Sequence, residues 1–251
     1  MKILFASFLF LLSFSSVESR DFLSEFHNQK TSEGFSVVEL FTSEGCSSCP
    51  PADEAIAEIK KEYPENVFVL SFHVDYWNYL GWKDEFSDAA YSQRQQRYGA
   101  AFNLGSIYTP QIVVNGKKEF VGSDKNLLEE TIQKEVSSTR NASFKINAES
   151  QDNKTVSVSY SVEKNAPAIL NIALVQLNAE SNVKRGENRG LKLKHVNVLR
   201  SFVAVVLGKL SAGSVKLEIP KGLNKNDCAV IAYLQDKNSF QISGAEKAVI
   251  K

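Results

Sequence analysis

The sequence lacks an excess of either charge, because 29 lysines and arginines balance 29 aspartates and glutamates among 251 residues. A basic surface of the kind that attracts nucleic acid or an anionic membrane is therefore not expected. The chain also has no internal repeat and no low-complexity tract. These absences predict a soluble globular protein that acts on proteins or small molecules, with no nucleic-acid partner.

Cysteine is scarce as well, since the chain has only Cys46, Cys49 and Cys228. Small secreted domains that depend on disulfides carry many paired cysteines. One close pair and one distant single residue make a poor scaffold but a good redox site. Cys228 precedes an apolar strand, and we interpret it as a buried small hydrophobic residue rather than a third redox thiol.

A long apolar run is present only at the start of the chain. Lys2 supplies a positive charge, residues 3–14 are apolar without an acid, and residues 17–19 suit a signal peptidase. This pattern predicts a signal peptide over residues 1–19 and export to the periplasm or secretion. An uncleaved anchor is the alternative, but the run is short for a bilayer. We expect no membrane span after cleavage.

The rest of the chain divides into two halves with different periodicity. Alternating strand and helix patterns predict an α/β domain over residues 20–139, and the polar stretch 137–141 is interpreted as a linker. Short runs rich in β-branched residues then predict a smaller all-β, sandwich-like domain over residues 140–251. The expected helices are 50–62, 88–102 and 124–136, and the expected strands are 36–41, 67–74, 111–115, 119–121, 156–162, 169–177, 196–207, 215–219 and 229–234.

The segment Cys46-Ser47-Ser48-Cys49 follows a predicted strand and opens a predicted helix. Amide groups and the dipole at a helix N-terminus stabilise a thiolate, which is the nucleophile of disulfide exchange. Cys49, one turn further on, suits the resolving role of attacking the mixed disulfide. Two alternatives stay open: a static disulfide, whose loop is too small to constrain much chain, and half of a zinc site, for which a second close Cys or His pair is missing.

Tyr108, Thr109 and Pro110 stand directly before the predicted strand 111–115. The order of strand, dithiol, helix, strand, helix and Thr-Pro is similar to thioredoxin-like folds, in which a cis proline lies against the dithiol. A cis bond here would present the backbone of Thr109 to an extended substrate beside Cys46. An ordinary trans proline at the start of a strand is the alternative.

Glu39 is a carboxylic acid in an otherwise apolar predicted strand. A buried carboxyl group beneath the dithiol can carry protons for the resolving thiol. The alternative is that Glu39 faces solvent near the end of the strand.

His73, Asp75 and Trp77 alternate at the end of the second predicted strand, so they share one side and could line a cleft. Together with Cys46 and Cys49, His73 could complete a Cu(I) site, because soft thiolates and imidazole suit this ion. A structural histidine and a packed tryptophan are the alternative.

Five motifs in the chain resemble a family of exported bacterial thioredoxin-like proteins catalogued as domain of unknown function 1223. They are VVELFTSEGCSSCPPAD, HVDYWNYLGWKDEFS, YSQRQQRY, YTPQIVVNG and GENRGLKLKHVNVLR, and they occur along nearly the whole mature chain. The resemblance implies an α/β thioredoxin-like domain with an appended C-terminal β domain. It implies no particular reaction.

Two features of this sequence depart from thioredoxin itself. Gly45 stands where an aromatic residue usually precedes the first cysteine, and the stretch between Cys49 and Pro110 is longer. The additional segment brings Trp77 and Arg97, which are expected to reshape the cleft and contact substrate. The alternative is that the residues of this segment only pack the additional helix. In the second half, the loop 186–190 could recognise a partner, close onto the first domain, or simply join two strands.

These observations predict a thiol–disulfide oxidoreductase without a cofactor. Cys46 attacks, Cys49 resolves, Thr109 and Pro110 shape the groove, and Glu39 carries protons, while Asp75, Trp77, Tyr108 and Arg97 contact the substrate. The expected partners are a protein or small-molecule thiol or disulfide and a separate redox partner. A copper-binding or metallochaperone-like protein and a non-enzymatic binding module are the alternatives.

Overall fold

The structure is a computed structural model, and it describes residues 34–138, 142–162, 168–208 and 212–251. The predicted signal peptide and the expected linker centre at 139–141 lie outside the described residues. No helix of the described part is long and apolar enough to cross a membrane.

The first half has the alternating elements that the sequence predicts. Its helices are α1 (Pro50–Glu62), α2 (Ala89–Ala101) and α3 (Lys125–Val136), and its strands are β1 (Ser36–Thr42), β2 (Val67–His73), β3 (Gln111–Val114) and β4 (Lys118–Val121). The side chains of Asp88 and Asp124 accept N-cap hydrogen bonds at α2 and α3. Asn115 and Gly116, both with positive φ, form the turn between β3 and β4.

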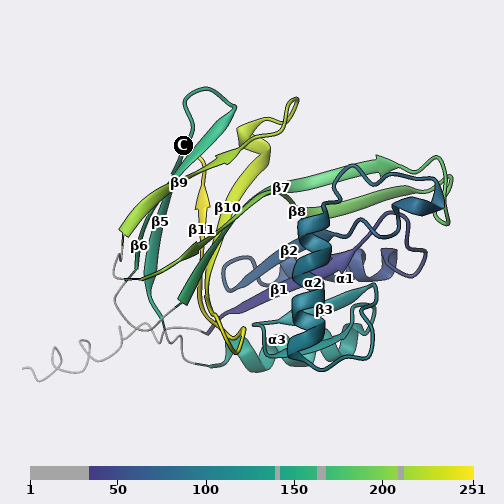
Figure 1. The fold of residues 1–251 in the computed structure, drawn as a ribbon, viewed down its shortest axis with the longest axis horizontal. Coiled ribbons are helices and arrows are strands. Elements are labelled where there is room, and N and C mark those ends of the chain that lie inside the picture. The colour runs from purple at the N-terminus through teal and green to yellow at the C-terminus, as the bar shows by residue number, and fades with distance from the viewer. Residues whose placement is uncertain (1–33, 139–141, 163–167, 209–211) are drawn as a thin grey trace, which may run out of the picture. The chain divides into compact units, whose positions relative to one another are not determined.

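The second half is built of strands, as expected, but with different bounds. They are β5 (Phe144–Glu149), β6 (Thr155–Val162), β7 (Ala168–Asn182), β8 (Lys192–Val206), β9 (Ala212–Glu218), β10 (Cys228–Asp236) and β11 (Ile242–Val249). The sequence patterns missed β5 and β11. They also underestimated β7 and β8, which form a long antiparallel hairpin (Figure 1).

One eight-stranded sheet runs through both halves of the chain, in the order β11-β10-β7-β8-β2-β1-β3-β4. A second sheet holds β5, β6 and β9. The separate C-terminal domain expected from the sequence is therefore not confirmed, because β8 pairs in parallel with β2 at Ser71 and Val198. The coarser prediction of a mixed α/β fold holds.

Side chains at the β2–β8 junction replace part of a regular ladder. The Ser71 hydroxyl donates to the carbonyl of Val196, and the Asn197 amide donates to the carbonyl of Val69. Asn197 has φ 46°, a conformation that asparagine tolerates better than most residues. This local break in the strand lets β8 join the sheet of the first half.

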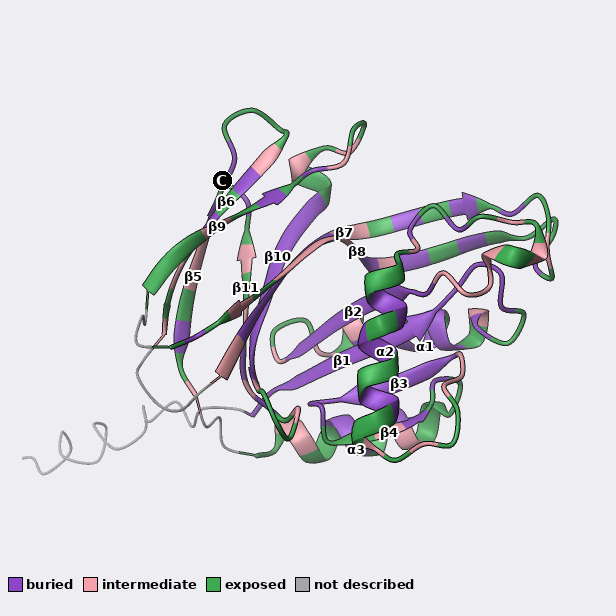
Figure 2. Cartoon of the chain, in the orientation of Figure 1, coloured by how far each residue is buried: buried purple, intermediate pink, exposed green. Residues whose placement is uncertain are grey.

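The strands β1, β2 and β10 are buried along nearly their whole length (Figure 2), because alternate side chains point into core on both faces of the large sheet. One face packs against α2 through residues such as Phe41, Phe72 and Tyr98. The other face packs against α1 and α3 on β1, β2 and β3. Over β7 and β10 it packs against the three-stranded sheet, in a sandwich-like arrangement.

Candidate functional site

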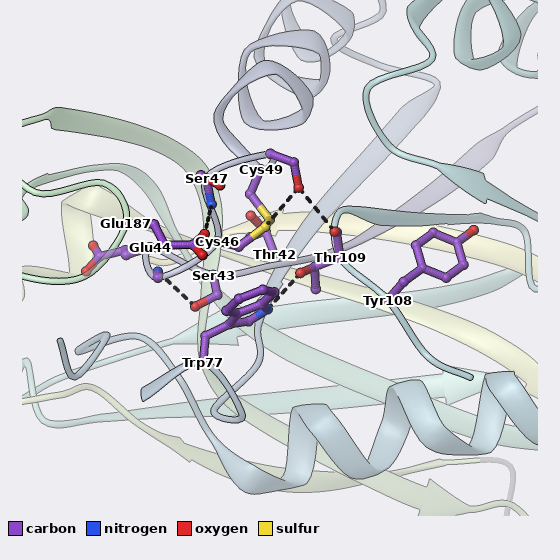
Figure 3. Close-up of a disulfide and its surroundings, with 12 residues drawn as sticks. Thr42, Ser43, Glu44, Cys46, Ser47, Cys49, Trp77, Tyr108, Thr109 and Glu187 are labelled. Atoms are coloured by element: carbon purple, nitrogen blue, oxygen red, sulfur yellow. Dashed lines mark hydrogen bonds between the residues drawn. A yellow bond between two sulfur atoms is a disulfide. The ribbon is translucent and has the colours of Figure 1, made fainter. Parts of the chain in front are cut away.

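Cys46 and Cys49 form a disulfide immediately before α1, with their Cα atoms 5.5 Å apart (Figure 3). Cys49 is the N-cap of the helix and Pro50 and Pro51 occupy its first turn, where a missing N–H costs little. Both cysteines are fully buried in this oxidised state, whereas Ser47 and Ser48 between them are exposed. The pair lies where the sequence places it, but its sulfurs are covered.

The Thr109–Pro110 peptide bond is cis, as predicted. The Ser48 hydroxyl lies 3.4 Å both from the Thr109 carbonyl oxygen and from the Cys46 sulfur. The Trp77 indole N–H donates to the Thr109 hydroxyl at 2.8 Å. The structure therefore brings the dithiol, Thr109, Pro110 and Trp77 together, as Figure 3 shows for the labelled residues.

The loop between β7 and β8 closes onto the dithiol segment. The Glu187 carboxylate accepts from the Ser47 N–H at 3.1 Å. The buried Asn188 amide donates to the carbonyls of both Glu44 and Cys46, each at 2.9 Å. Of the three possibilities that the sequence left open for this loop, closure onto the first half is the one observed.

A cluster of buried titratable side chains lies behind the dithiol segment. Asp53, on α1, accepts from the Thr42 hydroxyl, and its other oxygen lies 3.2 Å from Nδ1 of His195 on β8. Nε2 of His195 lies 3.7 Å from a Glu44 oxygen. Burial disfavours the imidazolium, but the carboxylates of Asp53 and Glu44 raise the pKa of His195 to about 10.

His73 belongs to the same cluster. Its Nδ1 lies 2.7 Å from Asp84, and its ring packs edge-on against that of His195, with centroids 4.7 Å apart. Burial alone would raise the pKa of Asp84, but His73 and the backbone N–H groups of Glu44 and Phe86 hold it below its ordinary value. One ligand-type atom from each of Asp53, His73 and His195 lies within 4.8 Å of the others. The structure thus places His73 beside these residues.

Glu39 is buried, but its contacts lie on the face of β1 that packs against α2. Arg94 donates to both of its oxygens, at 2.6 and 2.9 Å, and the Tyr98 hydroxyl donates at 2.7 Å. Burial works against the charge of Arg94, yet Glu39 holds the guanidinium pKa well above its ordinary value. These contacts favour an ion-pair role, and the proton-carrying role stays a prediction.

The other predicted substrate contacts are more scattered. Asp75 accepts from the Ser92 hydroxyl at 2.5 Å, which ties it to α2. Tyr108 donates to Glu119 at 2.5 Å, so its ring is tied to β4. Arg97 is exposed on α2. Their roles toward substrate stay predictions.

Comparison with known proteins identifies the family to which the chain belongs. The family described as "Protein of unknown function (DUF1223)" matches residues 37–235. The chain belongs to this family.

Two further similarities bear on the DUF1223 fold. A thioredoxin from Methanocaldococcus jannaschii is 33% identical over 98 residues, which is 39% of this chain and 92% of that protein. The crystal structure of protein AGR_C_4864 from Agrobacterium tumefaciens superposes with a TM-score of 0.66 at 29% identity, covering 86% of this chain and 94% of that one. Together with the Cys46–Cys49 pair, these similarities fit a thioredoxin-like protein with a redox-capable dithiol.

Sequence reasoning missed several residues of this DUF1223 site: Glu44, Asp53, Asp84, Asn188 and His195. No local pattern links these residues, because they are far apart in the sequence: His195 and Asp53 are in contact although 142 positions separate them. One signal was available but not used, since Leu193 and His195 share one side of the segment and alternate with Lys192 and Lys194, a pattern typical of a strand with that side buried. A buried histidine needs a polar partner, and that requirement points toward such a cluster.

Proposed function

We propose that this DUF1223 chain is an exported thiol–disulfide oxidoreductase, with Cys46 as the nucleophile and Cys49 as the resolving thiol. The observation that carries the proposal is the position of the Cys46–Cys49 pair, before the N-terminus of α1 and next to the Thr109–Pro110 segment. A helix N-terminus favours the thiolate that starts disulfide exchange. The similarity to a thioredoxin supports the same chemistry.

The reaction needs no cofactor, because the two sulfurs carry both electrons. In the reducing direction, the Cys46 thiolate attacks a substrate disulfide, forms a mixed disulfide and releases one substrate thiolate. The Cys49 thiolate then attacks the Cys46 sulfur, which closes the internal disulfide and releases the second substrate thiolate. A redox partner restores the dithiol by the reverse exchange. The oxidising direction runs the same steps backwards.

The substrate is a protein or small molecule that carries a thiol or disulfide. Thr109 and Pro110 border the dithiol, so an extended substrate has backbone groups to pair with beside Cys46. Trp77 supplies an apolar wall that is fixed by its hydrogen bond to Thr109. Tyr108 and Asp75 are near Thr109 and Trp77 in the sequence, Arg97 lies on α2, and all three are proposed as outer contacts.

Covalent trapping tests the proposal directly. Cys49→Ser removes the resolving thiol, so mixed disulfides on Cys46 should accumulate in the compartment where the protein works. Cys46→Ser together with Cys49→Ser is the matched control and should trap nothing, whereas Cys228→Ser combined with Cys49→Ser should trap as well as Cys49→Ser. If Cys49→Ser captures no more thiol-linked species than the double variant, the proposal fails.

Export is part of the same proposal. It is supported by the apolar start of the chain and by a chemistry that suits an oxidising compartment. The expected result is a mature protein that begins at Arg20 and is found in the periplasm or medium. Mass measurement of the N-terminal peptide from fractionated cells checks it, and an intact leader on cytoplasmic protein would contradict it.

A further inference from the structure

The buried cluster behind the dithiol segment takes no part in the exchange steps described above. Asp53, His73 and His195 come from α1, β2 and β8, and their exposed fractions are 4%, 0% and 3%. One nitrogen or oxygen atom from each of the three lies within 4.8 Å of the others. Elements from both halves of the chain therefore converge on one point.

The hydrogen bonds of His73 leave one ring nitrogen directed away from its partner. Nδ1 lies 2.7 Å from Asp84, whose other contacts are backbone N–H groups. Nε2 is buried and has no hydrogen-bond partner within the described residues. A carboxylate on one histidine nitrogen with the opposite nitrogen free is the arrangement that orients metal-binding histidines.

His195 is arranged differently, because the carboxylate that faces its Nδ1 belongs to Asp53, which is itself a proposed ligand. Its Nδ1 and the Asp53 oxygen are 3.2 Å apart, close to the separation of about 3.3 Å between two ligands of a tetrahedral ion bound at about 2.0–2.1 Å. Its Nε2 lies on the side of Glu44, at 3.7 Å. Nε2 of His195 and Oε1 of Glu44 are both buried and lack hydrogen-bond partners in the described part of the chain.

We infer that Asp53, His73 and His195 form a binding site for one divalent transition-metal ion, such as zinc. The ligand atoms are a carboxylate oxygen of Asp53, Nε2 of His73 and Nδ1 of His195. Two imidazoles and a carboxylate suit zinc and the neighbouring divalent metals. One ligand-type atom from each of the three residues lies within 4.8 Å of the others, so metal binding would draw the three side chains closer, toward a tetrahedral ligand separation of about 3.3 Å.

A second shell of side chains supports each ligand. Asp84 orients His73, Glu44 faces Nε2 of His195, and the Thr42 hydroxyl donates to the second oxygen of Asp53 at 3.1 Å. Trp82 fixes Glu44 with a 2.6 Å hydrogen bond. Three buried carboxylates face two histidines here, and a bound dication would replace the His195 proton in offsetting their negative charge.

The test uses the full mature protein with its dithiol oxidised, so that the sulfurs are not available as ligands. After metal removal, Co²⁺ is added as a spectroscopic probe and Zn²⁺ as a competitor. We expect one equivalent of Co²⁺ with the visible absorption of a site of low coordination number, displaced by Zn²⁺, and a rise of the unfolding midpoint with zinc concentration. If oxidised wild-type protein gives neither signal, the inference is overturned.

Variants then assign the ligands. His73→Gln and His195→Gln should each abolish Co²⁺ absorption in folded protein, as judged by circular dichroism, and Asp84→Asn should weaken binding about 10–100-fold. His27→Gln, the matched control outside the described residues, should bind as wild type. Binding that survives both ligand variants overturns the assignment.

The dithiol variants separate this inference from the proposed oxidoreductase. The Cys46→Ser, Cys49→Ser double variant should lose thiol exchange and keep one equivalent of Co²⁺. Metal binding that appears only with reduced cysteines would contradict the site and favour a sulfur-ligated copper or zinc centre. If the protein binds metal but exchanges no thiols, the proposed oxidoreductase function is refuted and the metal site is not.

Discussion

At the scale of single residues, we predict that the buried carboxylate of Glu39 stabilises the fold and takes no part in thiol exchange. Its oxygens are engaged by Arg94 and Tyr98, and it projects from the α2 face of β1, whereas Thr42 on the opposite face contacts α1. Glu39→Gln should lower the free energy of unfolding by about 3–5 kcal/mol, because Arg94 keeps a buried charge without its partner. Denaturant unfolding measures this loss.

The thiol-exchange rate of folded Glu39→Gln protein should match that of the wild type. Tyr98→Phe is a control that keeps the ion pair and removes the hydroxyl that donates to Glu39 and accepts from Arg94 and Gln235, at a cost of about 1–3 kcal/mol. A variant that stays stable but exchanges thiols more slowly would establish the proton-carrying role instead.

Cys228 differs from the dithiol in its surroundings. Burial, together with the adjacent Asp227, raises the pKa of this thiol to about 11. At pH 8 it stays protonated, so iodoacetamide should label Cys46 in the reduced protein and leave Cys228 unmodified until the chain unfolds. Peptide mass spectrometry checks this order. Labelling of Cys228 at the same rate as Cys46 at pH 8 would be inconsistent with its burial.

At the scale of elements, the loop of the β7–β8 hairpin is hydrogen-bonded to the dithiol segment, so we expect it to limit access to the sulfurs. Asn188 in its loop is buried and holds the carbonyls of Glu44 and Cys46. Asn188→Ala removes both hydrogen bonds and takes this donor from the Glu44 carbonyl, while the Cys46 carbonyl keeps the Cys49 N–H, at a cost of about 1–3 kcal/mol, and so favours an open loop. The rate of disulfide reduction by dithiothreitol should then rise by roughly tenfold, since about 1.4 kcal/mol corresponds to that factor.

The neighbouring Arg189 provides the comparison for this experiment. It is exposed in the same loop, so the Cys46–Cys49 disulfide of the Arg189→Ala variant should be reduced at the wild-type rate. Equal rates for Asn188→Ala and wild type would show that the loop does not limit access to the sulfurs.

The elements that the sequence predicts well are those fixed by local signals. Two prolines after Cys49, the aspartate caps of α2 and α3, and the Asn115-Gly116 turn each act within a few residues. The dithiol belongs to this class, whereas the cis Thr109–Pro110 bond was predicted from the order of elements, which is similar to thioredoxin-like folds. The cluster of Asp53, His73 and His195 is not fixed by local signals, because these residues come together only when particular strands pair.

The strand β8 shows why the pairing was not predictable. Its residues have the alternation of a sandwich strand, and nothing in that pattern indicates a parallel neighbour from the first half. The junction depends on Ser71 and Asn197, two polar residues whose hydrogen bonds replace ladder contacts. The change of periodicity and the polar stretch 137–141 therefore suggested a domain boundary, although the sheet is continuous across it.

At the scale of the whole molecule, both halves share the large sheet and its α2-side core. That core joins Phe41, Phe72 and Tyr98 of the first half to Val175 and Tyr233 of the second. Residues 32–251 group into one compact unit. Arg94 and Gln235 add a buried hydrogen bond of 3.1 Å between the halves. Neither half can therefore lose its structure without exposing apolar surface of the other.

Unfolding of the full mature chain should accordingly be a single cooperative transition. Trp77 and Trp82 report on the first half by fluorescence, and far-ultraviolet circular dichroism is sensitive to the strands of the second. The two probes should give the same midpoint in urea, because the shared sheet couples the halves. Two separated midpoints, or amide exchange that opens residues 142–251 well before β1 and β2, would mean that the halves are independent domains joined only at their surface.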